Sequence, residues 1–476
     1  MRKTVVLYPG LAVSHFVPMM QLADALLEEG YAVAVALIDA TMEFDASFAA
    51  AVRRVASSSK LAVTFHTLPR VQNLPTIAPS PQFLFGYFEL VRRYNEHLSE
   101  LLRSLPNLQA VIVDSLSNEV LDVNNSHGIP AYTFFAWSVS ALAVFLQLPS
   151  LRMEGRRRQP SFKELGDSPL NVLGVPPMPA SHLNREMLED PSSEIYRAMK
   201  SSFSKNLEAD GMLVNTFASL EARALGALKN PEFLLLGSEL TVPPVYSVGP
   251  LVERAAGRET REEHECLAWL DEQPEHSVVF LCFGSIGYHT EAQLKEMAVG
   301  LERSGHRFLW VVRAPPGHAD PDLDTLLPEG FLERTSGRGL VIKLWAPQVD
   351  VLRHKAVDAF VTHCGWNSVL EGIMGGCPML CWPLYAEQKM NKVFLVDEFG
   401  VGVEVVGWQQ GVVEAGEVEA KVTLVLESEE GERLRAKVTS LREAAAVAWN
   451  EGGSSRVAFG QFLLDLEGLG MGQGWA

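Results

Sequence analysis

Short apolar runs alternate with longer segments of helical periodicity along the first half of the chain. Thr4–Tyr8 is such a run and ends at a Pro-Gly pair, which is typical of a strand buried on both faces of a parallel sheet. Residues 16–29 show apolar positions at helical spacing, and further apolar runs occupy residues 31–38 and 110–113. This alternation predicts βαβ units and a doubly wound α/β sheet.

The same pattern starts again after a stretch with few apolar residues. Residues 253–265 are mostly charged and follow two proline-containing turns, so this stretch is the best candidate for a linker. A chain of 476 residues is also too long for one hydrophobic core. We therefore expect two α/β domains, with a ligand in the cleft between them at the carboxyl ends of their strands. In the second half the apolar runs lie at residues 278–283, 308–312, 341–344 and 359–362.

The charge balance excludes one class of partner. Acidic side chains outnumber basic ones by 58 to 40, and the formal net charge is −18. Such a surface repels nucleic-acid phosphates, although a single nucleotide can still bind to backbone N–H groups.

The five cysteines include Cys377 and Cys381, which lack a second pair to complete a zinc site, so we expect reduced, buried thiols and no metal.

No targeting segment is recognisable in the sequence. The first apolar run breaks at Pro9, too early for a signal peptide, and the apolar run at residues 133–148 is interrupted by polar side chains. We therefore expect a cytoplasmic protein without a membrane span.

The densest chemistry lies at residues 363–368, HCGWNS, directly after an apolar run. In one interpretation Asn367 and Ser368 only cap the helix that follows. In another, the free N–H groups and positive dipole end of that helix bind phosphate, while Gly365 permits close approach and His363 adds a donor. This segment alone does not separate the two.

The surrounding residues favour the nucleotide interpretation. Trp345 presents an aromatic face at the end of an apolar run, and Glu371 lies one helical turn beyond Asn367, where a carboxylate can accept hydrogen bonds from ribose hydroxyls. Glu387 and Gln388 open the next helical segment and suit the hydroxyls of a hexose. Each of these residues alone could have a purely structural role, but together they favour a nucleotide-sugar site.

The segment from Trp345 to Gln388 closely resembles the 44-residue signature box of plant UDP-dependent glycosyltransferases of family 1. FGS at residues 283–285 and WVVR at residues 310–313 extend the resemblance over nearly the whole chain. It implies a GT-B fold, in which two Rossmann-like domains face a central cleft, and an inverting reaction with no metal and no bound cofactor. We further expect a monomer, with domains at residues 1–250 (acceptor-binding), 251–265 (linker), 266–455 (UDP-sugar-binding) and 456–476 (a segment crossing back to the first domain).

The resemblance implies a role for each part of the donor site. The uracil ring would stack on Trp345 and pair with the backbone of Ala346, and a glutamine at Gln388 accompanies glucose more often than galactose. The remaining roles, carried over position by position, are Gln348 and Glu371 for the ribose, Ser285, His363, Gly365, Asn367 and Ser368 for the diphosphate, and Trp366, Glu387 and Gln388 for the sugar.

The resemblance also implies a catalytic histidine after the first strand, where His15 stands in an expected loop. An acceptor hydroxyl must lose its proton as it attacks the anomeric carbon, and an imidazole with an ordinary pKa of about 6.5 can take it. Asp114 follows the apolar run at residues 110–113 and matches the family's partner carboxylate. A carboxylate in that place would orient the imidazole and stabilise its protonated form.

The acceptor side is the least defined part of the sequence. Relatives have a threonine near Ala136 that contacts the sugar, and alanine cannot replace it, so Ser138 or a backbone group is expected to substitute. An apolar, aromatic pocket fits a planar phenol such as a flavonoid. The residues predicted to contact the acceptor are Phe16, Phe85, Trp137 and, from the second domain, Tyr385.

Several alternatives remain open at this point. A carbon of a phenolate ring can attack in place of oxygen, giving a C-glucosyltransferase, and the sequence separates the two poorly. A catalytically silent UDP-sugar-binding protein is a second alternative, although it would not need both His15 and Asp114. A nicotinamide oxidoreductase lacks support, because no GxGxxG follows the first strand. Asp320 to Asp324 imitate a metal-binding DxD motif but lie in a stretch typical of a solvated loop.

Overall fold

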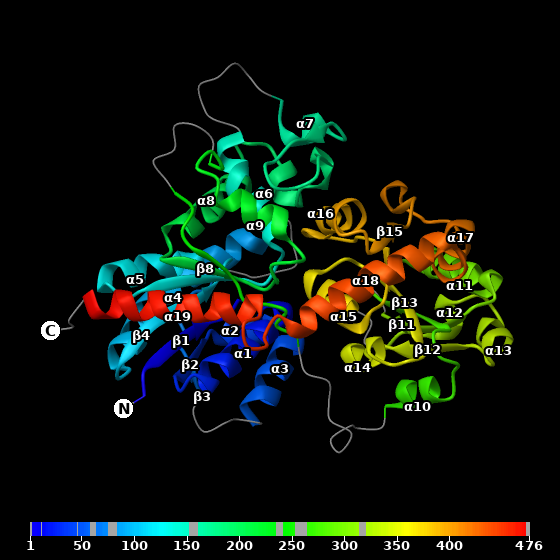
Figure 1. The fold of residues 1–476 in the computed structure, drawn as a ribbon, viewed down its shortest axis with the longest axis horizontal. Helices are drawn as coiled ribbons and strands as arrows, with labels where there is room; N and C mark the ends of the chain where they lie inside the picture. The colour runs from blue at the N-terminus through cyan, green and yellow to red at the C-terminus, as the bar shows by residue number, and fades with distance from the viewer. Residues whose placement is uncertain are drawn as a thin grey trace. The chain divides into compact units, whose positions relative to one another are not determined.

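The chain folds into two compact units, one comprising Met1–Glu253 and Ala448–Ala476 and the other Arg254–Val447. The structure is a computed structural model and describes residues 2–10, 12–44, 46–57, 63–74, 83–151, 160–234, 241–252, 264–313 and 320–472. Most of the linker predicted at residues 251–265 lies outside the described residues. The colours of Figure 1 show that the last helix returns to the first unit.

The first unit is built on a seven-stranded sheet in which all strands are parallel. The strand order is β3-β2-β1-β4-β5-β8-β9, so the chain leaves β1 in one direction and later returns to its other side at β4. In open α/β sheets, ligands bind at the carboxyl ends of the strands where the strand order reverses, which here are β1 and β4. The strands are β1 (Thr4–Tyr8), β2 (Ala32–Leu37), β3 (Val63–Thr67), β4 (Leu108–Asp114), β5 (Ala131–Phe135), β8 (Gly211–Val214) and β9 (Val245–Ser247).

Helices connect these strands as the alternating pattern predicts. The first of them, α1, begins at Val13, three residues before the start expected from the apolar periodicity. The helices are α1 (Val13–Glu28), α2 (Asp39–Phe44), α3 (Ala46–Ser57), α4 (Phe83–Ser104), α5 (Leu121–His127), α6 (Val139–Leu151), α7 (Phe162–Leu165), α8 (Glu194–Lys205), α9 (Ala222–Leu228) and α19 (Ser454–Gly472), and a small antiparallel pair joins β6 (Pro169–Leu170) to β7 (Met178–Pro179).

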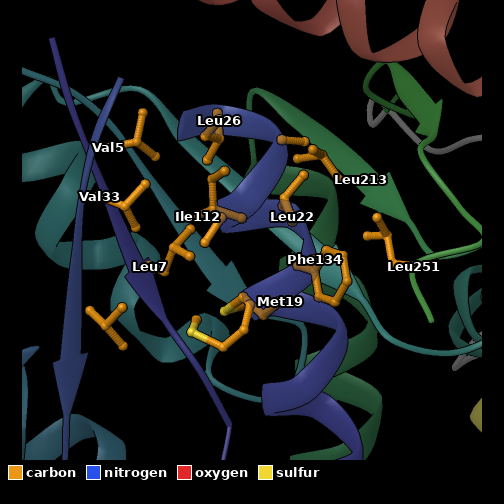
Figure 2. Packing of buried hydrophobic residues seen from close by; sticks show 14 of the residues in the cluster. Val5, Leu7, Met19, Leu22, Leu26, Val33, Ile112, Phe134, Leu213 and Leu251 are labelled. Carbon is orange, nitrogen blue, oxygen red and sulfur yellow. The ribbon is translucent and has the colours of Figure 1, made fainter. Parts of the chain in front are cut away.

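The apolar side of α1 packs on the sheet of the first unit. Figure 2 shows Met19, Leu22 and Leu26 of this helix facing the strands, where Leu7 of β1 and Ile112 of β4 meet them. All five side chains are fully buried. Burying a leucine or methionine side chain contributes roughly 1.5–3 kcal/mol. The apolar period of α1 therefore fixes which side of the helix faces β1 and β4.

The C-terminal helix α19 belongs to this same core. Phe459, Phe462 and Leu466 are buried in the cluster that contains β1 and α1. The Phe462 ring meets Tyr132 of β5 edge-on, with centroids 4.9 Å apart. Residues far apart in the sequence thus share one core, and the first unit is incomplete without the end of the chain.

The second unit has a six-stranded parallel sheet in the order β12-β11-β10-β13-β14-β15. Its strands are β10 (Val278–Cys282), β11 (Arg307–Val312), β12 (Gly339–Lys343), β13 (Val357–Thr362), β14 (Met379–Cys381) and β15 (Gly402–Glu404). Its helices are α10 (Glu265–Asp271), α11 (Glu291–Ser304), α12 (Leu323–Leu326), α13 (Phe331–Thr335), α14 (Gln348–Leu352), α15 (Trp366–Gly375), α16 (Gln388–Val393), α17 (Ala415–Glu427) and α18 (Glu429–Val447).

Side chains of this second sheet alternate between two buried faces. Leu281, Trp310 and Val312 lie in the core that also contains residues of α11 and α17. On the other face Phe280 stacks on Phe360, with centroids 5.4 Å apart, α14 contacts β10 and β13, and α15 contacts β13. Burial on both faces explains why these strands appear as continuous apolar runs in the sequence.

The packing of α19 makes a direct prediction about stability. Truncating Phe462 to alanine should lower the free energy of unfolding of the first unit by about 3–5 kcal/mol, because it leaves a cavity among Tyr132, Tyr246 and Phe459. Leu464 is 64% exposed on the same helix, so Leu464→Ala is the matched control. Urea denaturation followed by fluorescence measures both, and equal stability of the two variants would contradict the packing.

Candidate active site

His15 and Asp114 form a buried pair at the carboxyl ends of β1 and β4. His15 is in the first turn of α1, and Asp114 is the last residue of β4. The two strands are neighbours, with Tyr8 opposite Val113, so their ends deliver both side chains to one place. His15 Nδ1 lies 2.6 Å from Asp114 Oδ2. The side chains are 10% and 0% exposed, which shields the pair from water.

The position of His15 corrects one expectation. We expected it in a loop, but the helix begins two residues earlier. The first N–H groups of a helix are not used within it, so polar side chains are well tolerated in this turn. A helical backbone holds the imidazole more rigidly than a loop does.

The backbone around Asp114 holds the carboxylate in place. The N–H of Leu116 donates to Asp114 Oδ1 at 3.0 Å. Gly10 lies directly against the other side, because a Cβ at that position would be 2.7 Å from the same oxygen. Only glycine permits this approach, a requirement that the sequence motifs did not reveal.

The residues predicted to contact the acceptor have different environments. Trp137 is half-buried, and its ring meets His15 edge-on with centroids 5.4 Å apart. Phe85 is 37% exposed on α4. Phe16, in contrast, has no exposed surface and packs against Phe48 in the core. The prediction for Phe16 is therefore wrong, since the next helix position after His15 points inward to the sheet.

Ser138 does not have the role expected of it either. Its side chain is fully buried and accepts a hydrogen bond from the Ala141 N–H at 3.0 Å, which caps the start of α6. Glu221 adds a second cap, accepting from the N–H groups of Val139 and Ser140 at 3.0 and 2.8 Å. Ser138 is thus occupied as a structural residue and cannot replace the missing threonine.

In the second unit, the chain turns sharply from β13 into α15. Cys364 adopts a left-handed backbone with φ 65°, and Gly365 is the N-cap of the helix. Asn367 and Ser368 therefore lie in the first turn of α15 and do not occupy its N-cap position. Trp366, the first residue of the helix, is only 2% exposed, so its ring offers little surface to a ligand.

His363 is enclosed by the two glycines beside it. A Cβ at Gly284 or Gly365 would lie 2.6 or 2.5 Å from His363 Nε2. Burial lowers the pKa of His363 to about 4, so the ring is neutral near pH 7. It can donate a hydrogen bond to a phosphate oxygen, but it carries no positive charge there.

Gln348, Ser368 and Glu371 form a connected polar group beside this turn. Gln348 Nε2 donates to Ser368 Oγ at 2.9 Å and to Glu371 Oε2 at 2.6 Å. Trp345 follows β12 and is 57% exposed, an unusual exposure for a tryptophan. An exposed aromatic face close to a carboxylate and a carboxamide has the chemistry needed for a nucleoside.

The residues predicted for the hexose lie at the start of α16. Glu387 is 7% and Gln388 is 2% exposed. Gln388 Oε1 accepts from the N–H groups of Leu384 and Tyr385, both at 2.9 Å. Asn391, a residue that the sequence analysis missed, donates to the Cys364 carbonyl at 2.9 Å and joins α16 to the turn between β13 and α15. Gln388 therefore stabilises the loop that precedes α16, and its side-chain amide is also the group predicted to contact the hexose.

The residues whose spacing could suggest a metal site have structural roles. All five cysteines are free and buried, as expected. Asp322 caps α12, accepting from the Asp324 N–H at 3.2 Å and the Thr325 hydroxyl at 2.8 Å. Within the described ranges, no group of three or more histidine, cysteine, aspartate or glutamate side chains is arranged to hold a metal ion.

Over the same ranges, no helix combines the length and apolar character needed to cross a membrane.

Comparison with known proteins finds relatives along most of the chain. Residues 4–407 match the model of the family described as UDP-glucoronosyl and UDP-glucosyl transferase. The chain is 39% identical to an anthocyanidin 5,3-O-glucosyltransferase of a Rosa hybrid cultivar, over 95% of this chain and 96% of that one. It is 38% identical to a phloretin 2'-O-glucosyltransferase of Pyrus communis, over 96% and 98% of the two chains.

Solved structures of glycosyltransferases also resemble this chain over nearly its whole length. A Polygonum tinctorium UDP-glucosyltransferase capable of glucosylating indoxyl, in complex with 3,4-dichloroaniline, superposes with a TM-score of 0.86 at 33% identity, covering 98% of this chain and 99% of that one. Phytolacca americana UGT2, complexed with UDP-2-fluoro-glucose and pterostilbene, gives 0.82 at 30% identity, with coverage of 98% and 100%. The chain belongs to the UDP-glycosyltransferase family, which confirms the family and the GT-B fold class inferred from the signature box.

A second buried histidine predicts how stability depends on pH. His289 packs against Phe283, with centroids 4.3 Å apart, and burial lowers its pKa from 6.5 to about 4. Between these values the unfolded chain binds the proton and the folded chain does not, so stability is lost as the pH falls from 6.5 to 4. His289→Phe should reduce that loss by about 3 kcal/mol. Denaturant unfolding at several pH values measures it, and an unchanged pH dependence would contradict the burial.

Proposed function

We propose that this enzyme transfers glucose from UDP-glucose to a hydroxyl of a small phenolic acceptor of the flavonoid kind, with inversion at the anomeric carbon. The observation that carries the proposal is the buried contact of 2.6 Å between His15 and Asp114, because a silent sugar-nucleotide-binding protein has no need of it. Two relatives are named as glucosyltransferases of anthocyanidins and of phloretin, and these names support a phenolic acceptor of the flavonoid kind.

In the proposed reaction His15 is the general base. Its Nδ1 faces Asp114, so Nδ1 carries the hydrogen and Nε2 presents a lone pair to the acceptor hydroxyl. As that oxygen attacks the anomeric carbon, its proton moves to Nε2 and Asp114 stabilises the imidazolium that forms. Trp137, edge-on to His15, and the exposed Phe85 are proposed to contact the phenol.

In the same proposal the second unit binds the donor through its four chemical parts. Trp345 and the Ala346 backbone bind uracil, and Gln348 with Glu371 binds the ribose. The start of α15 binds the diphosphate with Ser285 and His363, since helix N-termini attract anions. Glu387 and Gln388 hold glucose. This chemistry requires no metal, and we propose that the enzyme acts as a cytoplasmic monomer.

Two substitutions test the catalytic pair. His15→Ala should lower turnover by a factor of about 100 to 10,000, and Asp114→Asn should also lower it strongly, because each removes proton transfer or its orientation. UDP binding, measured by titration calorimetry, should persist in both variants. His127→Ala is the control, since His127 bonds to Ser99 at 2.6 Å away from the pair. Unchanged turnover in either catalytic variant would refute the assignment.

The product tests the reaction and the acceptor class together. Incubation with UDP-glucose and a flavonoid panel should give a mono-glucoside whose anomeric configuration, read by NMR, is inverted to β. The glucose should be released by acid hydrolysis, since it is attached through oxygen. An acid-stable product would identify a C-glucosyltransferase, and the absence of any product from the panel would overturn the acceptor proposal.

A further inference from the structure

Among the described residues, Arg313 is a cation without a carboxylate partner at the end of an interior strand of the second unit. It follows β11 directly, and β11 lies between β12 and β10 in the sheet of the second unit. Its Nε atom is buried with no hydrogen-bond partner, and among the described residues no carboxylate pairs with its guanidinium. Two other arginines of this unit do have carboxylate partners: Arg334 pairs with Glu302 at 2.6 Å and Arg435 with Asp358 at 3.0 Å. A half-buried guanidinium without a carboxylate is costly, so a ligand is expected to satisfy it.

The strand pleat places Arg313 on the face of the sheet that carries α14 and α15. Trp310 and Val312 belong to the core on the opposite face, so the alternation sends Val311 and Arg313 the other way. Cys282, the last residue of β10, lies on this same side. α14 and α15 supply the residues proposed to bind ribose and diphosphate. β11 lies next to β12, which leads to α14, and one strand (β10) away from β13, which leads to α15.

The electrostatic neighbours of Arg313 agree with this placement. Burial lowers the pKa of Arg313, while the nearby Cys282 and Tyr385 side chains oppose that shift. Burial raises the pKa of Cys282 to about 11, and that thiol also senses the charges of Arg313 and Glu371. Arg313 therefore shares one neighbourhood with a proposed ribose ligand and with the loop before α16. Arginine stays protonated at neutral pH even so.

Among the described residues that we assign to the donor site, no other side chain carries a full positive charge near neutral pH. The N-terminus of α15 contributes only about half an elementary charge. His363 is neutral near pH 7, because burial lowers its pKa to about 4. The buried Lys392 of α16 is already paired with Glu404 at 2.9 Å. UDP gains negative charge as it leaves, so a cation that is not engaged elsewhere is the missing part of the site.

We propose that Arg313 binds the diphosphate of the nucleotide sugar and stabilises the UDP leaving group. This inference rests on the proposed function and adds a residue to it. When the bond between the anomeric carbon and the phosphate oxygen breaks, its electron pair remains on that oxygen. The new bond forms from the acceptor oxygen, and the acceptor proton moves to His15. The Arg313 guanidinium stabilises the negative charge that develops on the β-phosphate.

Comparing UDP with uridine separates this role from a structural one. In Arg313→Met, the affinity for UDP measured by titration calorimetry should fall about tenfold or more, as expected for a lost charge-assisted contact. The affinity for uridine, which has no phosphate, should change less than about twofold, and kcat should fall with UDP-glucose. Arg313→Lys should recover part of the UDP affinity, because it retains the charge. Arg307→Met is the matched control, since Arg307 lies at the other end of the same strand and bonds to Gln273 at 3.2 Å.

Two results would overturn the inference. Equal losses of UDP and uridine affinity would assign Arg313 a structural role, and unchanged UDP affinity with unchanged kcat would assign it none. Glu371→Gln tells such a failure apart from a failure of the proposed donor site. It should weaken UDP and uridine equally, because it acts on the ribose. If Glu371→Gln behaves so and Arg313→Met does not, only the role of Arg313 is refuted; if Glu371→Gln changes neither affinity, the donor site itself is wrongly assigned.

Discussion

The contact between His15 and Asp114 is the interaction on which the proposed activity depends. It exists because β1 and β4 are neighbours in a parallel sheet and because α1 begins close behind β1. Gly10 has no side chain to separate the two, and the Leu116 N–H holds the carboxylate. A buried aspartate is costly unless its charge is satisfied. Here a backbone donor and an imidazole satisfy it, so the arrangement that lowers this cost also orients the base.

The second unit solves a different electrostatic problem, which is to bind a diphosphate to a protein of net charge −18. Parallel strands bring the residues predicted for the donor to one edge of the sheet, and the N-terminus of α15 presents its N–H groups there. The neutral His363 supplies a hydrogen bond without charge. Under our proposal Arg313 supplies the charge, so the site attracts its anion locally although the protein as a whole repels it.

Much of this could be predicted from the sequence, for identifiable reasons. Buried parallel strands give continuous apolar runs, so β1, β2, β10 and β13 were recognisable, and the signature box identified the family. Shorter strands such as β8 and β9 were missed, because four or three residues give too little pattern. Contacts between distant segments were also hidden. The close approach of Gly10 to Asp114 and the burial of Phe16 against Phe48 depend on the folded sheet, and no local pattern reports them.

The proton position on His15 is the most direct test of the central claim. A long-range proton–nitrogen NMR spectrum of the nitrogen-15-labelled enzyme near pH 7.5, assigned with His15→Gln, reports which ring nitrogen of His15 carries hydrogen. The contact of Nδ1 with Asp114 at 2.6 Å predicts a protonated Nδ1 and an Nε2 that bears no hydrogen, ready to accept one from the acceptor. A His15 ring with hydrogen on Nε2 and none on Nδ1 would contradict the account, because such a ring could not act as the base.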